Sequence, residues 1–378
     1  KARFFKAYIS TLKILWRYLF LAFRLKFSSK TRRAEKSLQA HQKTAQEIRQ
    51  MVLSLKGLFI KVGQMLSIMT QFLPEAITQE LQGLQDSTPP SPFKDIQERI
   101  ESELKKPLSE LFASFEEEVL ASASLGQVHR ARSHQGEELA IKIRHPGIET
   151  LVALDLRILR RIFNLLNWAF PNYGLKRSFE EIKEVVLQEL DFKIEAKNLE
   201  ILRKNLSQFS QILLPKSYPD LSTSRILTLE YIHGFKIRDL KSLEEHRIDP
   251  KEVAKLLVEI YCQQIFVDGF YHADPHPGNF LIQSQAGESP QNFRLVLLDL
   301  GAVSQVSAEM RQGMAQFMKG VLKRDTELLS QSMKDMGFIA QNEDEEVFNR
   351  IVEFFYERLK DIKIEDLQSF KLENLGKL

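Results

Sequence analysis

The chain has 378 residues, a formal net charge of +3, 43% hydrophobic residues and 27% charged residues. These ordinary values exclude a disordered, collagen-like or disulfide-rich protein. Cys262 is the only cysteine, which excludes an intrachain disulfide framework and a zinc site built on cysteines. The length predicts two or three domains or one large two-lobed unit. No apolar run reaches the roughly 18 residues of a membrane-spanning helix, so we expect none within the chain.

The first 36 residues are strongly basic. They carry 11 Lys or Arg and one acid, Glu35, which gives this N-terminal segment a net charge of +10. The rest of the chain, here called the body, therefore has a net charge of −7. Residues 8–27 have the periodicity of an amphipathic helix, with Lys6, Lys13, Arg17 and Arg24 in one sector. We therefore expect residues 1–27 to contact a membrane lipid surface. Packing on the protein itself and a targeting remnant are the alternatives. Because the body is acidic, we expect no nucleic-acid partner.

The body alternates between helical and strand-like patterns. Helices are predicted over 36–86, 93–112 and 149–205, around a proline-rich loop at 85–92. Short strands are predicted at 119–120, 126–129, 139–143, 212–216 and 225–232, and an extended stretch at 271–301 interrupts a mainly helical remainder. The fold class is therefore α+β, with a small β-containing N-lobe, a helical C-lobe and an N-terminal helical extension. The predicted domains are 1–36, 37–114, 115–232 and 233–378.

A lysine and a glutamate occupy apolar patterns where a lone charge is costly. Lys142 lies inside the strand 139–143, and Glu189 lies in the apolar stripe of a helix predicted to open at Ser178. A strand lysine paired with a helix glutamate orients nucleotide phosphates in kinases. We expect Lys142 to pair with Glu189, and a solvated stripe edge is the alternative for Glu189.

The segment 272–280, HADPHPGNF, carries the strongest signal. Asp274 and Asn279 are five positions apart, as are the substrate-orienting Asp and the metal-binding Asn of a kinase catalytic loop. Metal ligation by His272, Asp274 and His276 is a rival interpretation, and a structural loop is another.

Two further segments complete the predicted nucleotide site. Asp299 follows an apolar strand and precedes Gly301, and its carboxylate is predicted to chelate Mg²⁺. No G-x-G-x-x-G precedes the strand lysine. Small residues stand there instead and allow close backbone approach to phosphates; they are Ala121, Ser122, Ala123 and Ser124. The run 226–232 predicts backbone contacts to adenine from Glu230, Tyr231 and Ile232.

With these motifs in this order, the sequence resembles the UbiB family of atypical protein-kinase-like proteins, also called aarF-domain kinases. The resemblance covers about residues 50–340. It includes the family's K-x-G-Q motif at 61–64, E-x-D at 189–191 and H-A-D-P-H-P-G-N at 272–279. Ser122 stands where the family usually has Ala, and Leu300 where Phe is usual. On a predicted helix from 55 to 73 that is apolar on both sides, Lys61 and Gln64 would point into protein, toward the nucleotide pocket.

The resemblance implies ATP and Mg²⁺ as cofactors and an ATPase or phosphotransferase that supports isoprenoid quinone or related prenyl-lipid biosynthesis. It implies prenyl-lipid or quinone-biosynthesis enzymes as partners. The expected location is a membrane, at the cytoplasmic face of a bacterial inner membrane or an organellar membrane in a eukaryote. In the expected mechanism Lys142 contacts the phosphates, Asn279 and Asp299 bind Mg²⁺, and Asp274 orients the acceptor. The alternatives are a nucleotide-sensing scaffold without turnover and a small-molecule kinase. The sequence predicts no oligomeric state.

Overall fold

The computed structural model describes residues 2–26, 30–55, 57–68, 75–82, 89–169, 171, 174–285, 292–323 and 325–337. The chain divides into two units. Unit 1 comprises Lys1–Ile194 and Lys216–Tyr231, and unit 2 comprises Glu195–Pro215 and Ile232–Leu378. The helical extension thus groups with the first sheet, and residues 195–215 group with unit 2. Within the described residues, none of the helices combines the length and apolarity needed to cross a membrane.

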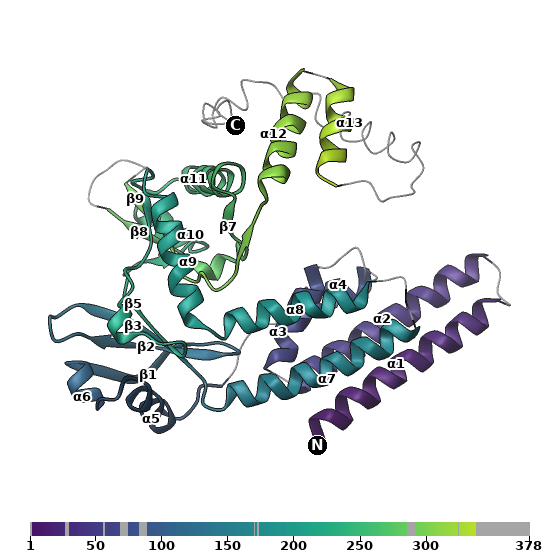
Figure 1. The fold of residues 1–378 in the computed structure, drawn as a ribbon, viewed down its shortest axis with the longest axis horizontal. Helices are drawn as coiled ribbons and strands as arrows, with labels where there is room; N and C mark the ends of the chain where they lie inside the picture. Colours follow the sequence, from purple (N-terminus) through teal and green to yellow (C-terminus); the bar gives the residue numbers. More distant parts are fainter. Residues whose placement is uncertain are drawn as a thin grey trace. The chain divides into compact units, whose positions relative to one another are not determined.

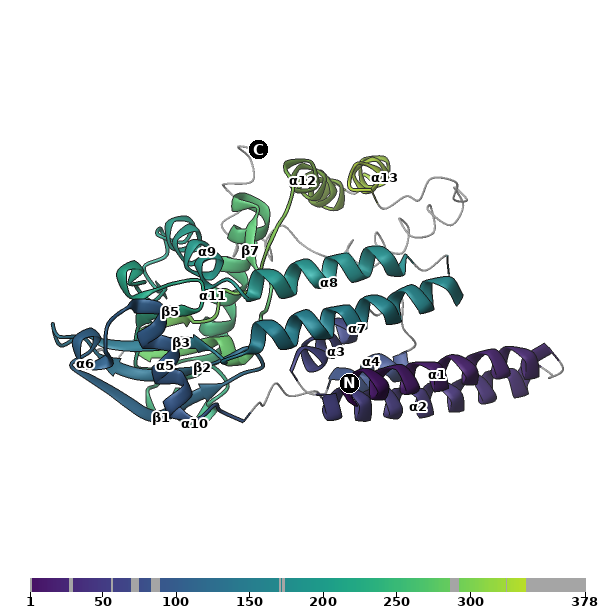
Figure 2. The same cartoon turned by 60° about the horizontal axis from the view of Figure 1, so that its bottom comes forward.

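Long helices form one layer of unit 1 (Figures 1 and 2). They are α1 (Ala2–Lys26), α2 (Lys30–Leu55), α7 (Ile148–Ala169) and α8 (Leu175–Glu189), with the shorter α3 (Leu58–Ile68) and α4 (Glu75–Gln82). The pairs α1–α2 and α7–α8 lie side by side. Apolar residues at helical spacing on α7, among them Val152, Leu159 and Ile162, are buried in a shared core with α3 and α8.

The helix predicted from 55 to 73 is interrupted. Leu55 ends α2, and Gly57 has a left-handed φ of 55°, so α3 starts at Leu58. Residues 69–74 lie outside the described residues. On α3, Leu58, Phe59, Ile60 and Val62 are all buried, so this helix is enclosed on both sides.

Unit 1 also contains an antiparallel sheet of four strands, in the order β1-β2-β3-β5. Its strands are β1 (Ser114–Ser122), β2 (Gly126–Arg132), β3 (Glu138–Arg144) and β5 (Ile226–Glu230). They are longer than the predicted 119–120, 126–129 and 139–143, and Gly136 forms the β2–β3 turn with φ 87°. Two short helices, α5 (Phe93–Leu104) and α6 (Leu108–Leu111), pack on one face of the sheet and share a hydrophobic core with it.

The entry to α8 differs from the prediction. The predicted cap at Ser178 is wrong, because the N-cap is Gly174 with φ 61°, and Ser178 is a buried residue inside the helix. The helix also stops at Glu189, and a separate helix, α9 (Phe192–Asn205), follows after a turn. The apolar stripe that included Glu189 therefore spans two helices.

Unit 2 contains helices and two small sheets (Figure 1). Its helices are α10 (Leu240–Glu245), α11 (Pro250–Cys262), α12 (Ala308–Lys323), α13 (Thr326–Asp335) and most of α9. Asp249 caps α11, its side chain accepting from the Lys251 amide, and Gly269 ends the helical run with φ 65°. The run closes with a π-helical segment, η3 (Gln263–Asp268).

The sheets of unit 2 have the orders β4-β9-β8-β6 and β10-β7. Their strands are β4 (Ile212–Leu213), β6 (Phe235–Lys236), β7 (Phe270–His272), β8 (Phe280–Ser284), β9 (Phe293–Leu297) and β10 (Val303–Gln305). Short 3₁₀ turns are η2 (Pro219–Leu221), in unit 1, and η4 (Pro277–Asn279). The buried side chains Phe280, Ile282, Phe293 and Leu295 anchor β8 and β9.

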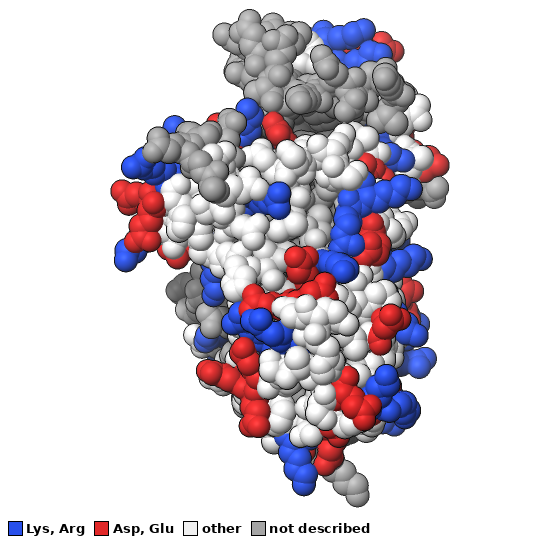
Figure 3. All heavy atoms as spheres, turned by 90° about the vertical axis from the view of Figure 1, so that its left-hand side faces the viewer, with Lys and Arg blue, Asp and Glu red and all other residues white. Residues whose placement is uncertain are grey.

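Charged side chains of both signs are interspersed on the face drawn in Figure 3. Local pairs on α8 show the same mixing: Arg177 bonds Glu181 at 2.9 Å, and Lys183 bonds Glu180 at 2.8 Å. Such exposed pairs contribute at most about 1 kcal/mol each, so the core decides the fold.

Candidate functional site

Lys142 lies on the sheet face of unit 1 opposite α5 and α6. Alternation along β3 sends Leu139, Ile141 and Ile143 into the core, where each is 0% exposed, and sends Lys142 to the other face. Its amine lies 5.2 Å from the centre of the Phe192 ring, within cation–π range.

Half-buried apolar side chains share that face with the amine. Val128 on β2 is the cross-strand partner of Lys142, and Leu229 on β5 is the partner of Ala140. All three are half-buried rather than buried. Sequence reasoning missed this apolar floor, although the alternation around Lys142 was a signal for it. An amine beside a flat apolar surface suits a ligand with a planar ring and a phosphate.

Glu189 has a partner that the sequence argument did not name. Lys61 Nζ on α3 lies 2.7 Å from Glu189 Oε1, at the end of α8, and both side chains are largely buried. The lysine of 61–64 and the glutamate of 189–191 therefore meet within unit 1, and Gln64 lies half-buried one turn along α3. Lys61 is therefore one partner of Glu189, and the expected pairing of Glu189 with Lys142 stays a prediction.

The small-residue segment forms the turn between β1 and β2. The Ala123 amide donates to the Gly126 carbonyl at 2.9 Å, and the Ala123 carbonyl lies 3.0 Å from His145 Nε2. A Cβ on Gly126 would meet the Ile143 carbonyl oxygen at 2.5 Å, so only glycine fits there. The Ser122 hydroxyl oxygen is buried and has no hydrogen-bond partner among the described residues. The turn is held tightly and carries a polar group that a ligand could satisfy.

The predicted adenine-contacting residues follow β5. The Glu230 amide donates to Lys216 and the Tyr231 amide to Glu138, at 2.8 and 2.9 Å. Both backbone N–H donors are thus used within unit 1. Ile232 is the first residue of unit 2 after the boundary.

In unit 2, strand pairing brings the two predicted metal-site loops together. One loop joins β7 to β8 and the other joins β9 to β10, while β7 pairs with β10 and β8 with β9. Direct bonds connect the loops: the Ala273 amide donates to Ala302 at 2.9 Å and the Leu298 amide to Asn279 at 3.0 Å. Asp274, Asn279 and Asp299 are therefore on adjacent loops.

Asp274 and Asn279 are hydrogen-bonded to each other. Asn279 Nδ2 donates to Asp274 Oδ2 at 3.0 Å and to its carbonyl at 3.1 Å. This orientation uses the amide nitrogen and presents the Asn279 oxygen as the remaining polar atom of the side chain. The Asp274 Oδ1 atom accepts from the His276 amide at 3.3 Å, so the loop itself orients the carboxylate.

Asp299 turns back onto its own loop, where the Gly301 amide donates to Oδ1 at 3.0 Å. A second acid lies nearby: a Cβ on Gly301 would be 3.2 Å from Asp299 Oδ1 and 3.7 Å from Glu195 Oε2. Glu195 and Asn198 on α9 are both buried, and Asn198 donates to the Leu300 carbonyl at 3.1 Å. Sequence reasoning missed Glu195, whose signal was an acid one turn before the buried Leu199.

The rival metal site at His272, Asp274 and His276 does not match the geometry. His272 is 0% exposed, stacks edge-on against Phe280 and lies 3.4 Å from the Tyr261 hydroxyl. Burial lowers the pKa of His272, and the charges of Asp299 and Asp274 oppose that shift. His276 Nδ1 accepts from Gly278, and no cluster of three or more acidic, His or Cys side chains suits a metal within the described chain.

The donor set does fit Mg²⁺. A carboxylate from Asp299 and an amide oxygen from Asn279 are hard oxygen ligands, and Mg²⁺ is usually held by few protein ligands together with phosphates and water. The adjacency of the two loops supplies both ligands from one unit.

The chain is similar to a known protein family and to several of its members. Residues 83–333 match the model of the ABC1 atypical kinase-like domain. A chloroplast protein of Arabidopsis thaliana, activity of bc1 complex kinase 8, is 34% identical over 90% of this chain and 45% of its own length. AarF domain-containing protein kinase 1 of Xenopus tropicalis is 33% identical over 85% of this chain and 61% of its own length. The chain thus spans about half of these relatives.

A solved structure shares the fold. Rv3197 of Mycobacterium tuberculosis, determined in complex with erythromycin, aligns with a TM-score of 0.58 and 25% identity, covering 86% of this chain and 81% of that chain. The predicted α+β, bilobal kinase-like fold is confirmed by this likeness and the domain match. The chain belongs to the UbiB family of atypical, protein-kinase-like proteins, alongside the AarF domain-containing kinases.

Proposed function

We propose that the chain binds Mg-ATP and acts as an atypical phosphotransferase or ATPase. The observation that carries the proposal is the pair of adjacent loops that bring Asp274, Asn279 and Asp299 together in unit 2. Family membership and the lysine on the apolar sheet face of unit 1 support it.

Each residue has a proposed role. Lys142 contacts phosphate, while Val128, Ala140 and Leu229 form an apolar surface for the purine. The turn at residues 121–124 lies against phosphate through its backbone, and the carbonyl groups of Glu230 and Tyr231 face the base. Lys61, Gln64 and Glu189 form a polar group that limits access to the acceptor side.

The metal would be held by Asn279 and Asp299, and when bound it would neutralise charge on the phosphates. The Asp274 carboxylate, oriented by Asn279, accepts the proton of an acceptor hydroxyl or of water. Its position next to the amide of Asn279 couples this acceptor to the metal ligand through one hydrogen bond.

Substitution of the two aspartates separates binding from turnover. We expect Asp299→Asn to abolish the Mg²⁺-dependent rise of the melting temperature with ATP, because a carboxylate ligand is lost. We expect Asp274→Asn to keep that rise and to lower the steady-state ATPase rate by at least about 100-fold. Differential scanning fluorimetry and phosphate release measure the two effects. An unchanged ATP response in Asp299→Asn would contradict the assignment.

A nucleotide-sensing scaffold is the alternative function. It would bind Mg-ATP and show no turnover above the Asp274→Asn background, even with prenyl-lipid precursors and anionic vesicles present. A small-molecule kinase would instead transfer phosphate to hydroxylated metabolites. Phosphate release measured across these additions discriminates among the three.

We also propose that α1 lies on an anionic lipid surface. Five large apolar side chains of α1 are exposed, at helical spacing along one face: Phe5, Ile9, Leu12, Trp16 and Phe20, at 62, 60, 42, 72 and 52%. This row extends over about 22 Å of helix at 1.5 Å per residue. The opposite face, with Ala7, Thr11 and Leu15, is buried within unit 1.

The positive charge of α1 favours an anionic lipid surface, rather than a second copy of the chain, as the binding partner of its apolar row. Residues 2–26 contain six Lys or Arg and no acid, so two copies related by a two-fold axis through α1 would repel each other. Lys13 and Arg17 both pair with Glu47, at 3.1 and 2.6 Å, but the Lys13 side chain remains 65% exposed next to the apolar row, whereas that of Arg17 is 18% exposed. Of the predicted cations Lys6, Lys13, Arg17 and Arg24, Lys13 is therefore better exposed than Arg17 to contact lipid headgroups. An aromatic row edged by cations suits the interface of an anionic bilayer.

Vesicle flotation tests this proposal. We expect Trp16→Ser/Phe20→Ser to lower binding to anionic vesicles at least tenfold, because two exposed aromatic side chains no longer enter the interface. Trp168→Ser, which replaces a side chain that is 78% exposed on α7, is the matched control and should bind as wild type. Equal binding of the two variants would refute the assignment, and self-association through α1 would appear as a concentration-dependent mass in ultracentrifugation.

On this basis we propose that the ATP-dependent step supports isoprenoid quinone or related prenyl-lipid biosynthesis at a membrane, together with the enzymes of that pathway. The location would be the cytoplasmic face of a bacterial inner membrane, or an organellar membrane in a eukaryote. Stimulation of phosphate release by a prenyl-lipid precursor, absent with a saturated phospholipid, is the expected observation.

A further inference from the structure

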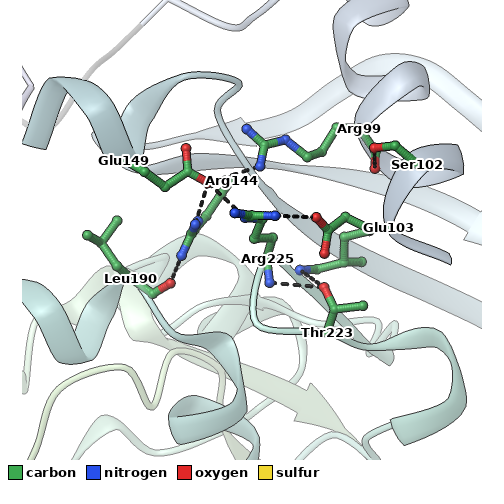
Figure 4. A network of polar contacts seen from close by, with 9 residues as sticks. Arg99, Ser102, Glu103, Arg144, Glu149, Leu190, Thr223 and Arg225 are labelled. Atoms are coloured by element: carbon green, nitrogen blue, oxygen red, sulfur yellow. Dashed lines mark hydrogen bonds and ion pairs between the residues drawn. The ribbon is translucent and has the colours of Figure 1, made fainter.

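A partly buried network of arginines and glutamates links five elements of unit 1 (Figure 4). Glu149, in the first turn of α7, accepts from Arg144 at the end of β3, from Arg99 on α5 at 2.9 Å, and from Arg225 next to β5 at 3.0 Å. Arg225 also bonds Glu103 on α5 at 2.6 Å. The network therefore ties the strand that carries Lys142 to the helices around it.

Arg144 differs from the other two arginines in one contact. Its second terminal nitrogen donates to the carbonyl of Leu190, 46 residues away, as Figure 4 shows. Leu190 caps the C-terminus of α8 directly after Glu189. Because the last carbonyl groups of a helix have no intrahelical donor, a side chain must supply one when the end is buried. Arg144 is that donor, and it is 5% exposed.

We propose that Arg144 is a positioning residue for the Lys61–Glu189 pair. By bonding the peptide that follows Glu189, it fixes this carboxylate relative to β3 and Lys142, which lies two residues before Arg144. The backbone supports the same placement, since the Phe192 amide donates to Ser224 at 3.1 Å, next to Arg225. The effect of Arg144 on nucleotide binding rests on the proposed function. Its effect on the position of Glu189 depends only on the structure of unit 1.

Glu149 holds Arg144 in the required orientation. A guanidinium can bridge a carboxylate and a carbonyl at once, through two nitrogens in a fixed plane, whereas an ammonium group is a point donor on a flexible stem. Removing Arg144 leaves Glu149 with Arg99 and Arg225, so no buried charge loses all its partners. A methionine at position 144 therefore deletes the bond to Leu190 in a chain that still folds.

Hydrogen–deuterium exchange of the nucleotide-free chain tests the placement. We expect Arg144→Met to speed amide exchange in 189–194 about tenfold or more relative to wild type, as expected for loss of a charged hydrogen bond. Arg99→Met is the matched control, since Arg99 shares Glu149 but its bond in the network does not extend to Leu190. Equal exchange at 189–194 in the two variants would overturn the inference, as would acceleration spread evenly over β3 and α7.

Nucleotide affinity supplies the second measurement. In a double-mutant cycle, Arg144→Met should weaken Mg-ATP binding in the wild-type background and have less effect in Lys61→Met, because the pair it positions is already gone. The cycle of Arg99→Met with Lys61→Met should be additive. Additivity in both cycles would overturn the inference. Wild-type protein that binds no nucleotide would refute the proposed function and leave the exchange result to decide the placement.

Discussion

At the scale of single residues, several carboxylates lie in partly or fully buried positions, where each needs a nearby cation to offset the cost of desolvation. Glu189 illustrates this: its apolar surroundings in the sequence demand a partner, and Lys61 meets it at 2.7 Å. Glu149 has three arginines around it. A buried carboxylate without such partners would be neutral rather than charged.

Glu149 makes a testable contribution to acid stability. Burial alone would raise its pKa, but the hydrogen bonds from Arg99 and Arg144 outweigh burial and lower the pKa from 4.5 to about 2. A carboxyl whose pKa is lower in the folded chain stabilises it above the unfolded value, and this contribution is lost as the pH falls from about 4.5 toward 2. We expect Glu149→Gln to be less stable than wild type at pH 6, with the difference shrinking by pH 3.

Urea unfolding at both pH values measures that difference. Glu181→Gln is the control, because Glu181 is 53% exposed and its pair with Arg177 should contribute little at either pH. A constant difference between wild type and Glu149→Gln over this range would contradict the prediction.

At the scale of elements, α1 is fixed to unit 1 by a charged contact across 152 residues. Arg3 donates to both carboxylate oxygens of Asp155 on α7, at 3.2 and 2.6 Å, and also to the Leu55 carbonyl. Asp155 is 0% exposed, and burial raises its pKa although Arg3 opposes the shift. The Arg3 side chain is 30% exposed, so the two partners are not equivalent.

This asymmetry predicts unequal effects of substitution. Arg3→Met should lower the free energy of unfolding by about 3–5 kcal/mol, because it leaves a buried carboxylate unpaired. Asp155→Asn should cost only about 1–2 kcal/mol, since Arg3 can reach water and keeps its bond to Leu55. Urea denaturation of the two variants and of the double variant gives the comparison, and an Asp155→Asn cost equal to or above that of Arg3→Met would refute the argument.

At the scale of the whole chain, charge is divided between a basic start and an acidic remainder. Residues 1–36 carry +10 and the rest carries −7, so the net charge of +3 conceals the contrast. In the vesicle experiment, binding of wild type should therefore fall as salt is raised from 50 to about 300 mM, because screening weakens the attraction to anionic lipid. The apolar row of α1 should leave a residual, salt-insensitive part of the binding.

The sequence by itself determined the elements and motifs with local signals. The strands near 126–129, 139–143 and 225–232 and the extended segment that holds Asp274, Asn279 and Asp299 were predictable, because spacing and turn residues act within a few positions. The start of α8 was not, because Gly174 in a left-handed conformation competes with the local cap at Ser178.

Only the tertiary structure decided which distant residues meet. The sequence pattern predicts that Glu189 needs a cationic partner, but only the folded chain shows that Lys61 lies 2.7 Å from its carboxylate. The same holds for the two faces of α1 and for Arg144 and Leu190, whose contact depends on where β3 ends relative to α8. Two charged side chains pair when the fold brings them close together in space. For residues far apart along the chain, the number of residues between them does not predict whether they meet.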